Sequence, residues 1–336
     1  MAEPSRPYDE NLVCPLTGGD LFRGEHDLAT RDGRHRYDVD DGILRMFVDP
    51  EAPTAGALSG TTRTVQDFYT DAPFPNYGDF DDIQAFIARA ETGFFARSLS
   101  RQLPPRSKVL EVGCGTGQLS NYLAATTDCR VYAADMTLAS LRLARDFAAK
   151  NAIEDIEFLQ MNLFHPCVRP GSMDFVISNG VLHHTADPRE AFRRVASLVR
   201  PGGHVAIGLY NHIGRLRTDL RRWLYGILGE SALRLDPRLR RKDLSTAKRR
   251  AWTRDQYLHP RESKHSMSET LRWFAEEGVE FVSSRPKIVG PLEEDERIFE
   301  AVSPGSALRR LATETEMLFS HYGTAGGLYL MIGRRR

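Results

Sequence analysis

The stretch that most constrains the fold is V-L-E-V-G-C-G-T-G-Q-L-S at residues 109–120, where an apolar run ends at Glu111. Gly113, Gly115 and Gly117 follow at alternate positions, directly before a segment with helical spacing. A glycine-rich turn between a strand and a helix lets the backbone approach a ligand closely, and the N–H groups at the helix start can bind it. The stretch therefore predicts a strand, a loop and a helix arranged around a ligand.

Strand-like and helix-like segments alternate from Lys108 onward. Apolar runs of strand length occur at 108–112, 130–135, 156–160, 173–178 and 204–210. Helical spacing occurs at 118–126, 138–150 and 188–199, and the last of these has Asp187 as N-cap and Pro188 at its first position. A helix at 268–278 and strands at 279–284 and 328–333 follow, whereas residues 285–327 show no clear pattern. This alternation predicts an α/β fold with a parallel sheet and helices on both faces.

The expected domain organisation has three parts. Residues 1–50 form a small module, and residues 50–62, rich in Pro, Gly, Ala, Ser and Thr, predict a linker. Residues 63–104 contain a dense aromatic stretch and then a helical pattern from about 80 to 103, which predicts a helical lid segment. Residues 105–336 form the main domain, interrupted by an insertion at about 211–265.

Two ligand classes suit the glycine-rich loop. Dinucleotide-binding folds use G-x-G-x-x-G, but the position of the third glycine is Gln118 here, and the spacing is G-x-G-x-G. Asp135 ends the second strand, where a carboxylate accepts hydrogen bonds from ribose hydroxyls in either class. The acid therefore predicts a ribose-bearing ligand without choosing between the classes.

Four motifs in order resemble the class I S-adenosylmethionine-dependent methyltransferases. They are E-V-G-C-G-T-G at 111–117, the acid Asp135, S-N-G-V-L-H-H-T-A-D-P at 178–188, and V-R-P-G-G-H-V at 199–205. The resemblance covers residues 105–210 well and the last two strands more loosely. It implies a Rossmann-like sheet of seven strands, mostly parallel with the last strand antiparallel, and S-adenosyl-L-methionine as the cofactor.

The resemblance also implies roles for individual residues in cofactor binding. The methionine part of the cofactor would face Glu111 and the loop of Gly113, Cys114, Gly115 and Gly117, with the backbone of Asn179 nearby. Asp135 would bind the ribose hydroxyls and Met136 would pack on adenine. Relatives often have an acid after the third strand for the adenine amino group, and here Asn162 stands there beside Leu163. An amide oxygen can accept the same bond.

The small module of residues 1–50 resembles a degenerate zinc ribbon of the kind found beside many methyltransferases. Such modules have C-P-x-C early, but here Thr17 occupies the position of the second cysteine and Cys14 is left alone. The segment 30–34 (T-R-D-G-R) lacks the second cysteine pair. One thiolate cannot complete a tetrahedral zinc site, so we expect no metal. An unrelated N-terminal hairpin is the alternative interpretation.

Candidate catalytic residues follow the fourth strand. His183 and His184 lie where such sheets bind ligands, and an imidazole has a suitable pKa for a general base. The alternative is that these histidines only shape the turn. S-N-G-V at 178–181 differs from the Asn/Asp-Pro-Pro-aromatic motif of many amide and nucleobase N-methyltransferases, which disfavours that chemistry.

Substrate selection is expected from segments added to the core. The candidates are lid or pocket aromatics and polar residues near strand ends: Tyr69, Phe74, Tyr77, Tyr210, Asn211, Tyr257 and His259. The insertion at 211–265 has fifteen Lys and Arg against six Asp and Glu, a charge of 15 − 6 = +9. Its apolar helical stripe from Ile213 to Leu228 predicts a helix buried on the pocket mouth. A lid for an anionic substrate, a membrane-surface helix and an RNA-facing surface are the alternatives.

Composition limits the class of protein. The formal net charge is zero, so no global field favours nucleic acid, and the sequence contains neither a signal peptide nor a run of about 18 apolar residues. Four cysteines without paired spacing indicate a reduced, cytoplasmic setting. We expect a methyltransferase acting on a small molecule, most readily at oxygen. An RNA or protein methyltransferase, and a non-catalytic cofactor-binding regulator, remain as alternatives.

Overall fold

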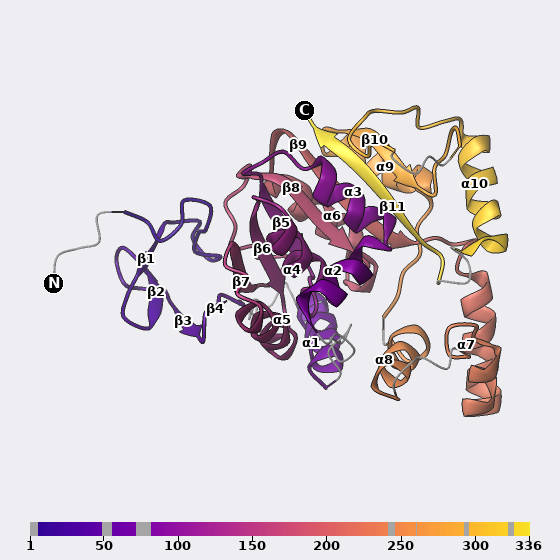
Figure 1. The fold of residues 1–336 in the computed structure, drawn as a ribbon, viewed down its shortest axis with the longest axis horizontal. Helices are drawn as coiled ribbons and strands as arrows, with labels where there is room; N and C mark the ends of the chain where they lie inside the picture. Colours follow the sequence, from indigo (N-terminus) through magenta and orange to yellow (C-terminus); the bar gives the residue numbers. More distant parts are fainter. Residues whose placement is uncertain are drawn as a thin grey trace.

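A parallel sheet forms the centre of the molecule in a computed structural model (Figure 1). The structure describes residues 6–48, 56–71, 82–240, 246–259, 261–291, 296–321 and 326–336. Seven strands have the order β7-β6-β5-β8-β9-β11-β10, and β11 runs antiparallel to both neighbours. This confirms the expected fold class. The strands are β5 (Lys108–Val112), β6 (Arg130–Asp135), β7 (Ile156–Gln160), β8 (Met173–Asn179), β9 (Val199–Tyr210), β10 (Val279–Arg285) and β11 (Leu328–Arg335).

Both faces of the sheet are buried, which explains why its strands are continuous apolar runs rather than alternating ones. Val109 and Phe175 face one core, and Leu110 and Val176 face the other. On the first face pack α2 (Ile83–Glu91), α3 (Phe94–Gln102) and α4 (Gln118–Thr126). On the second pack α6 (Pro188–Leu198) and α9 (Met267–Glu276), while α5 (Leu138–Lys150) covers β6 and β7.

Helix α6 begins as its sequence predicts. The side chain of Asp187 accepts a hydrogen bond from the Glu190 N–H at 3.0 Å, and Pro188 occupies the first turn, where no N–H is needed. Helix α9 uses the same device, with Ser266 capping the Glu269 N–H at 3.1 Å.

The N-terminal module extends the sheet rather than standing apart from it. Its strands are β1 (Leu21–Arg23), β2 (Asp27–Thr30), β3 (Arg36–Asp40) and β4 (Ile43–Arg45), and β4 pairs in parallel with β7. The Tyr132 hydroxyl on β6 donates to Asp9 at 2.7 Å. Cys14 is buried with its sulfur 3.0 Å from the Tyr37 hydroxyl. No cluster of three metal-ligating side chains occurs in the described parts of the chain.

Several elements differ from the sequence expectations. The expected linker at 50–62 instead contains the start of α1 (Gly56–Asp71), so Gly, Ser and Thr there did not prevent a helix. The helical pattern at 80–103 is two helices separated at Gly93, and residues 285–327 contain α10 (Ala307–Phe319). The fifth strand begins at Val199, five residues earlier than expected.

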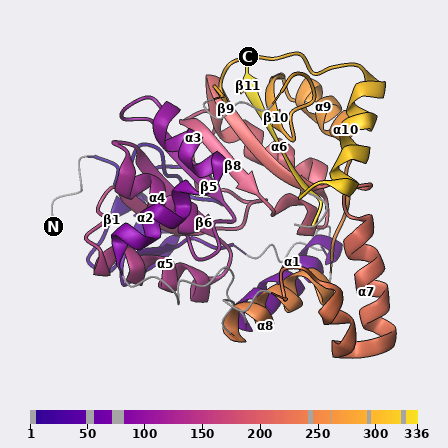
Figure 2. The same ribbon diagram turned by 45° about the vertical axis from the view of Figure 1, so that its right-hand side comes forward.

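The insertion is helical and supplies residues to the cavity wall, but the apolar stripe of its first helix is exposed rather than buried on the pocket mouth as predicted. It contains α7 (Leu216–Leu228), the 3-10 segment η3 (Gly229–Leu235) and α8 (Thr246–Tyr257), with α8 lying beside α1 in Figure 2. The apolar stripe of α7 faces outward, and Leu220 and Trp223 are 58% and 62% exposed. Arg215 and Arg221 are buried instead, because the inner face of α7 makes ion pairs with Glu262 and Asp236. Among the residues described, no helix is long and apolar enough to cross a membrane.

Candidate active site

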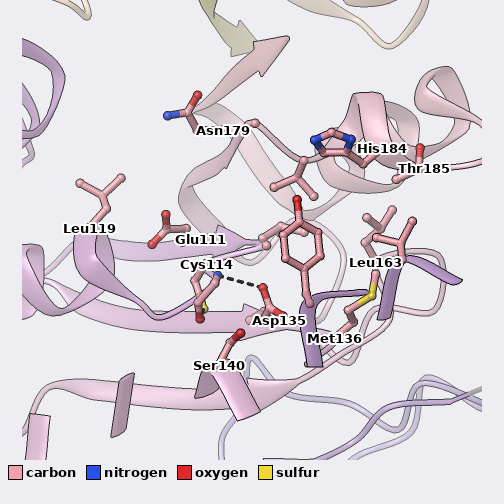
Figure 3. Close-up of a pocket in the computed structure, with 18 of the residues that line it drawn as sticks. Glu111, Cys114, Leu119, Asp135, Met136, Ser140, Leu163, Asn179, His184 and Thr185 are labelled. Carbon is pink, nitrogen blue, oxygen red and sulfur yellow. Dashed lines mark hydrogen bonds between the residues drawn. The ribbon is translucent and has the colours of Figure 1, made fainter. Parts of the chain in front are cut away.

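A cavity of about 530 Å³ opens at the carboxyl ends of β5, β6, β7 and β8 (Figure 3). Residues of α1 and of the insertion also line it. This is the edge at which ligands bind in sheets of this type. Of the residues singled out in the sequence, those lining the cavity are Glu111, Gly113, Cys114, Gly115, Asp135, Met136, Asn162, Leu163, Asn179, His184, Tyr69 and Tyr210. Phe74 and Tyr77 lie outside the described residues.

The glycine-rich loop has the backbone that its sequence requires. Gly113, Gly115 and Gly117 have φ values of +76°, +54° and +70°, a region that favours glycine. A Cβ on Gly113 would lie 2.3 Å from a methyl group of Val181, so this glycine allows the loops after β5 and β8 to meet at the cavity. Gly117 instead precedes α4 against Ala144 and does not line the cavity.

Glu111 lies one residue before the end of β5, with its carboxylate buried in the cavity wall. Its Oε2 accepts hydrogen bonds from the Ser120 N–H at 3.0 Å and from the Ser120 hydroxyl at 2.5 Å. Burial raises the pKa of Glu111 from 4.5 to about 7, although the bonds from Ser120 oppose that shift. The carboxylate is therefore fixed in direction and poorly solvated, so a cationic ligand beside it would stabilise its ionised form.

Asp135 ends β6, and each of its oxygens is held by a backbone N–H. Oδ2 accepts from Gly115 at 2.8 Å, the bond drawn in Figure 3, and Oδ1 accepts from Thr137 at 2.8 Å. Burial raises the pKa of Asp135, although the hydrogen bonds from these N–H groups lower it. A carboxylate has about four acceptor positions, so two remain for a ligand.

The far end of the cavity lies between the loops after β6 and β7. Met136 and Leu163 supply apolar walls there. The Asn162 amide donates to the Val48 carbonyl at 3.1 Å, and its oxygen accepts from the Phe164 N–H at 3.1 Å. Asn162 therefore fastens its own loop to the N-terminal module, a role that the sequence did not indicate.

The two candidate histidines have different environments. His184 lines the cavity, and its Nδ1 donates to the Arg261 carbonyl at 2.8 Å, which leaves Nε2 as an acceptor. Burial lowers the pKa of His184 to about 4, so the ring is neutral near pH 7. His183 is fully buried, 4.1 Å from the Tyr210 ring, and does not line the cavity. This corrects the expectation that both histidines could meet a substrate.

Three further candidates have structural positions away from the cavity. Asn211 is fully buried, and its oxygen accepts from the N–H groups of Ile213 and Gly214, both at 2.9 Å, which shapes the turn before α7. The Tyr257 hydroxyl donates to Asp236 at 2.7 Å. His259 stacks on His184 at 3.7 Å behind the cavity wall.

The cover of the cavity includes α1, which contacts both the insertion and the loop after β6. The Arg254 guanidinium of α8 lies 4.5 Å from the centre of the Phe68 ring of α1. The Gln66 amide of α1 donates to the Met136 carbonyl at 2.8 Å, and Val65 and Tyr69 face the cavity. By contrast, α2 and α3 supply no residue to the cavity, so within the described parts of the expected lid segment the lining residues come from α1.

The sequence analysis missed Arg238 and Trp252, which line the cavity from the insertion. The Arg238 guanidinium lies 4.0 Å from the centre of the Trp252 ring. The buried Asp236 positions both, because it accepts from the Trp252 indole N–H at 2.9 Å and from the Arg238 backbone N–H at 2.8 Å. The sequence contained Asp236 as one of six acids in a basic segment, but its burial and its contacts with Arg238 and Trp252 depend on the tertiary fold.

Comparison with known proteins agrees with this geometry. Residues 110–207 match the family model described as a methyltransferase domain. The Ubiquinone biosynthesis O-methyltransferase of Cronobacter sakazakii is 34% identical over 155 residues, 46% of this chain and 56% of that protein. An uncharacterized protein of Synechococcus sp. is 29% identical over 201 residues, 53% of this chain and 48% of that protein. The chain thus spans about half the length of these curated relatives.

A solved structure shows the same fold. PKMT2 from Rickettsia typhi superposes with a TM-score of 0.50 and 14% sequence identity, covering 74% of this chain and 54% of that chain. The strand order, the glycine-rich loop and the two strand-end carboxylates agree with the family match over residues 110–207. Residues 110–207 therefore belong to a methyltransferase domain, and the sheet around them has the topology expected of the class I S-adenosylmethionine-dependent enzymes.

Proposed function

We propose that the protein transfers a methyl group from S-adenosyl-L-methionine to a small-molecule acceptor. The observation that supports this most is the pairing of Glu111 and Asp135 around the glycine-rich loop in one cavity. Asp135 has acceptor positions for the two ribose hydroxyls, and Glu111 offers a poorly solvated carboxylate to the cationic methionine part. Met136 and Leu163 supply an apolar site for adenine.

The chemistry then needs little from the protein beyond alignment. The bound cofactor supplies a methyl group already activated on a sulfonium. The chain's own residues must hold the acceptor atom in line with that methyl group and exclude water. The α1 helix and the insertion serve this purpose, since Val65, Tyr69 and Trp252 close the cavity with apolar and aromatic surface.

Oxygen is the acceptor atom that we favour. The named relative from Cronobacter is an O-methyltransferase, although the match covers only part of each chain. Neutral His184 presents Nε2 as a hydrogen-bond acceptor for a hydroxyl of the substrate. Because its pKa is about 4, His184 orients that hydroxyl more effectively than it removes the proton.

Arg238 gives the acceptor pocket a charge preference. It is the one Lys or Arg among the described residues that line the cavity, and it is held over Trp252. We assign to it the recognition of a carboxylate or other anionic group on an aromatic acceptor, since guanidinium binds such groups with charge-assisted hydrogen bonds.

The test is transfer of labelled methyl from S-adenosylmethionine to a panel of phenols that includes catechol carboxylates and their neutral methyl esters. We expect labelled product from a phenol that carries a carboxylate. The Arg238→Met variant should have a higher KM for that acceptor, whereas its KM for the neutral methyl ester should change little. The exposed Arg250→Met is the matched control in the same segment. Labelling of RNA or protein but of no phenol would contradict the small-molecule proposal.

A further inference from the structure

The outer side of the insertion carries an apolar surface that the proposed function does not use. Leu216, Leu220, Trp223, Ile227 and Leu228 are between 51% and 62% exposed, and the first four recur at helical spacing along α7. Phe319, 73% exposed at the end of α10, joins them, because Arg217 of α7 lies 6.0 Å from its ring. We call these six exposed residues the α7 face.

The outward orientation of this face is fixed by the polar inner face of the helix. Arg215, with no exposed surface, makes an ion pair with Glu262 and donates to the Gly326 carbonyl at 3.0 Å. Arg222 donates to the His259 carbonyl at 2.8 Å. Turning α7 to bury its apolar side would leave these guanidinium groups without their partners, and losing one partner of a buried ion pair is strongly destabilising.

The insertion that carries the α7 face exposes mostly basic charged side chains, and one of them, Arg217, lies against Phe319 of the face. Among residues 211–259 whose side chains the structure describes, Glu230 is the exposed acid, whereas four arginines that do not line the cavity are exposed: Arg217, Arg234, Arg240 and Arg250. One of them lies on α7, and the others lie on η3, on α8 or on the chain that joins η3 to α8. Both η3 and α8 contact α7. An apolar stripe beside a basic surface is the pattern of helices that lie in the interface of an anionic membrane.

We infer that the α7 face docks on anionic lipid membranes. The leucines, Ile227 and Trp223 would enter the boundary between headgroups and acyl chains, and the arginines would contact lipid phosphates. A second copy of the chain is a poorer occupant, because pairing through α7 would bring together two segments of charge +9 each.

Docking in this way would place the active-site cover next to the lipid. Arg238 and Trp252, which line the cavity, belong to the same insertion as the α7 face. An apolar acceptor dissolved in the bilayer would then have a short path to the cavity. The docking inference does not depend on the methyltransferase proposal, because it uses none of the cofactor-site residues.

The test is co-sedimentation of the full chain with vesicles of phosphatidylcholine alone or mixed equally with phosphatidylglycerol. We expect binding to the anionic vesicles only, weakened by salt. Trp223 should report it by a blue shift of fluorescence, since Trp252 and Trp273 are already buried at 6% and 5% exposure. The double variant Leu220→Ser/Trp223→Ser should bind roughly tenfold more weakly or worse.

Controls separate docking from misfolding. The variant should keep the melting temperature of the wild type, because both side chains are exposed, and Leu308→Ser on α10 is the matched exposed apolar change outside the α7 face. Failure to bind anionic vesicles, or equal binding to neutral ones, would overturn the inference. A dimer in light scattering that the double variant converts to monomer, without any vesicle binding, would assign the face to a second copy.

Discussion

At the scale of single residues, the cavity holds two carboxylates with different partners. Asp135 is bound by two backbone N–H groups and keeps acceptor positions open, whereas Glu111 is bound by Ser120 and carries a pKa raised to about 7. The sequence predicted both acids because each lies at or next to the end of a strand beside the glycine-rich loop, a relation set by local chain order. The sequence did not predict that Arg238 lines the cavity, because that position depends on its contacts with Asp236 and Trp252 in the folded insertion.

Asp135→Ala should weaken binding of S-adenosylhomocysteine while the protein stays folded. The change removes a charged acceptor from two ribose hydroxyls, and a hydrogen bond to a charged group contributes about 1.5–3 kcal/mol. Calorimetric titration should therefore show an affinity at least about tenfold lower. Asp128→Ala, at an exposed position before β6, is the control and should bind normally. Unchanged affinity of Asp135→Ala would place the ribose site elsewhere.

Glu111 should make the stability of the ligand-free protein depend on pH. Its folded pKa is raised above the ordinary 4.5 to about 7, so its stabilising contribution is complete below pH 4.5 and is lost as pH rises through 7. Relative to Glu111→Gln, the wild type should lose about 1.4 kcal/mol of unfolding free energy per pH unit across that window. Urea unfolding at pH 5, 6 and 7 measures this.

The matched control for that experiment is Glu154→Gln, an exposed acid before β7. Its stability should follow the wild type at every pH. If the difference between wild type and Glu111→Gln were the same at pH 5 and pH 7, Glu111 would be ionised throughout, and its burial would not control its charge.

At the scale of elements, periodicity identified helices but not the surfaces that they contact. The spacing of apolar residues correctly placed a helix near 216–228, yet the apolar side faces outward. The orientation is decided by the ion pair of Arg215 with Glu262, a residue 47 positions later, which no local pattern encodes. The parallel strands were easier to predict, because burial on both faces leaves a continuous apolar run.

Asp236→Ala should loosen the part of the insertion that covers the cavity. The substitution leaves the buried Trp252 N–H and Tyr257 O–H without their acceptor, at about 1–3 kcal/mol for each. Hydrogen exchange should speed up over 229–257, while affinity for S-adenosylhomocysteine changes little because Asp236 does not line the cavity. Glu230→Ala, at an exposed acid nearby, should leave exchange unchanged. If the amide hydrogens of residues 229–257 exchanged equally slowly in both variants, Asp236 would not be what holds this cover.

At the scale of the whole molecule, three additions surround one methyltransferase sheet. The N-terminal module extends the sheet beyond β7, α1 closes the cavity from one side, and the insertion closes it from the other. The core was predictable because four motifs occur in family order within about a hundred residues. The arrangement of the additions was not, because it depends on contacts between segments far apart in sequence, such as α1 with α8.

The central claim is that the cavity binds S-adenosylmethionine, and thermal unfolding with its product tests this most directly. Ligand that binds only the folded state at about 100 times its dissociation constant adds about 2.7 kcal/mol of stability. We predict that S-adenosylhomocysteine raises the melting temperature in a concentration-dependent way, that Asp135→Ala reduces the shift, and that NADH has no effect. A shift with NADH and none with millimolar S-adenosylhomocysteine would contradict the account.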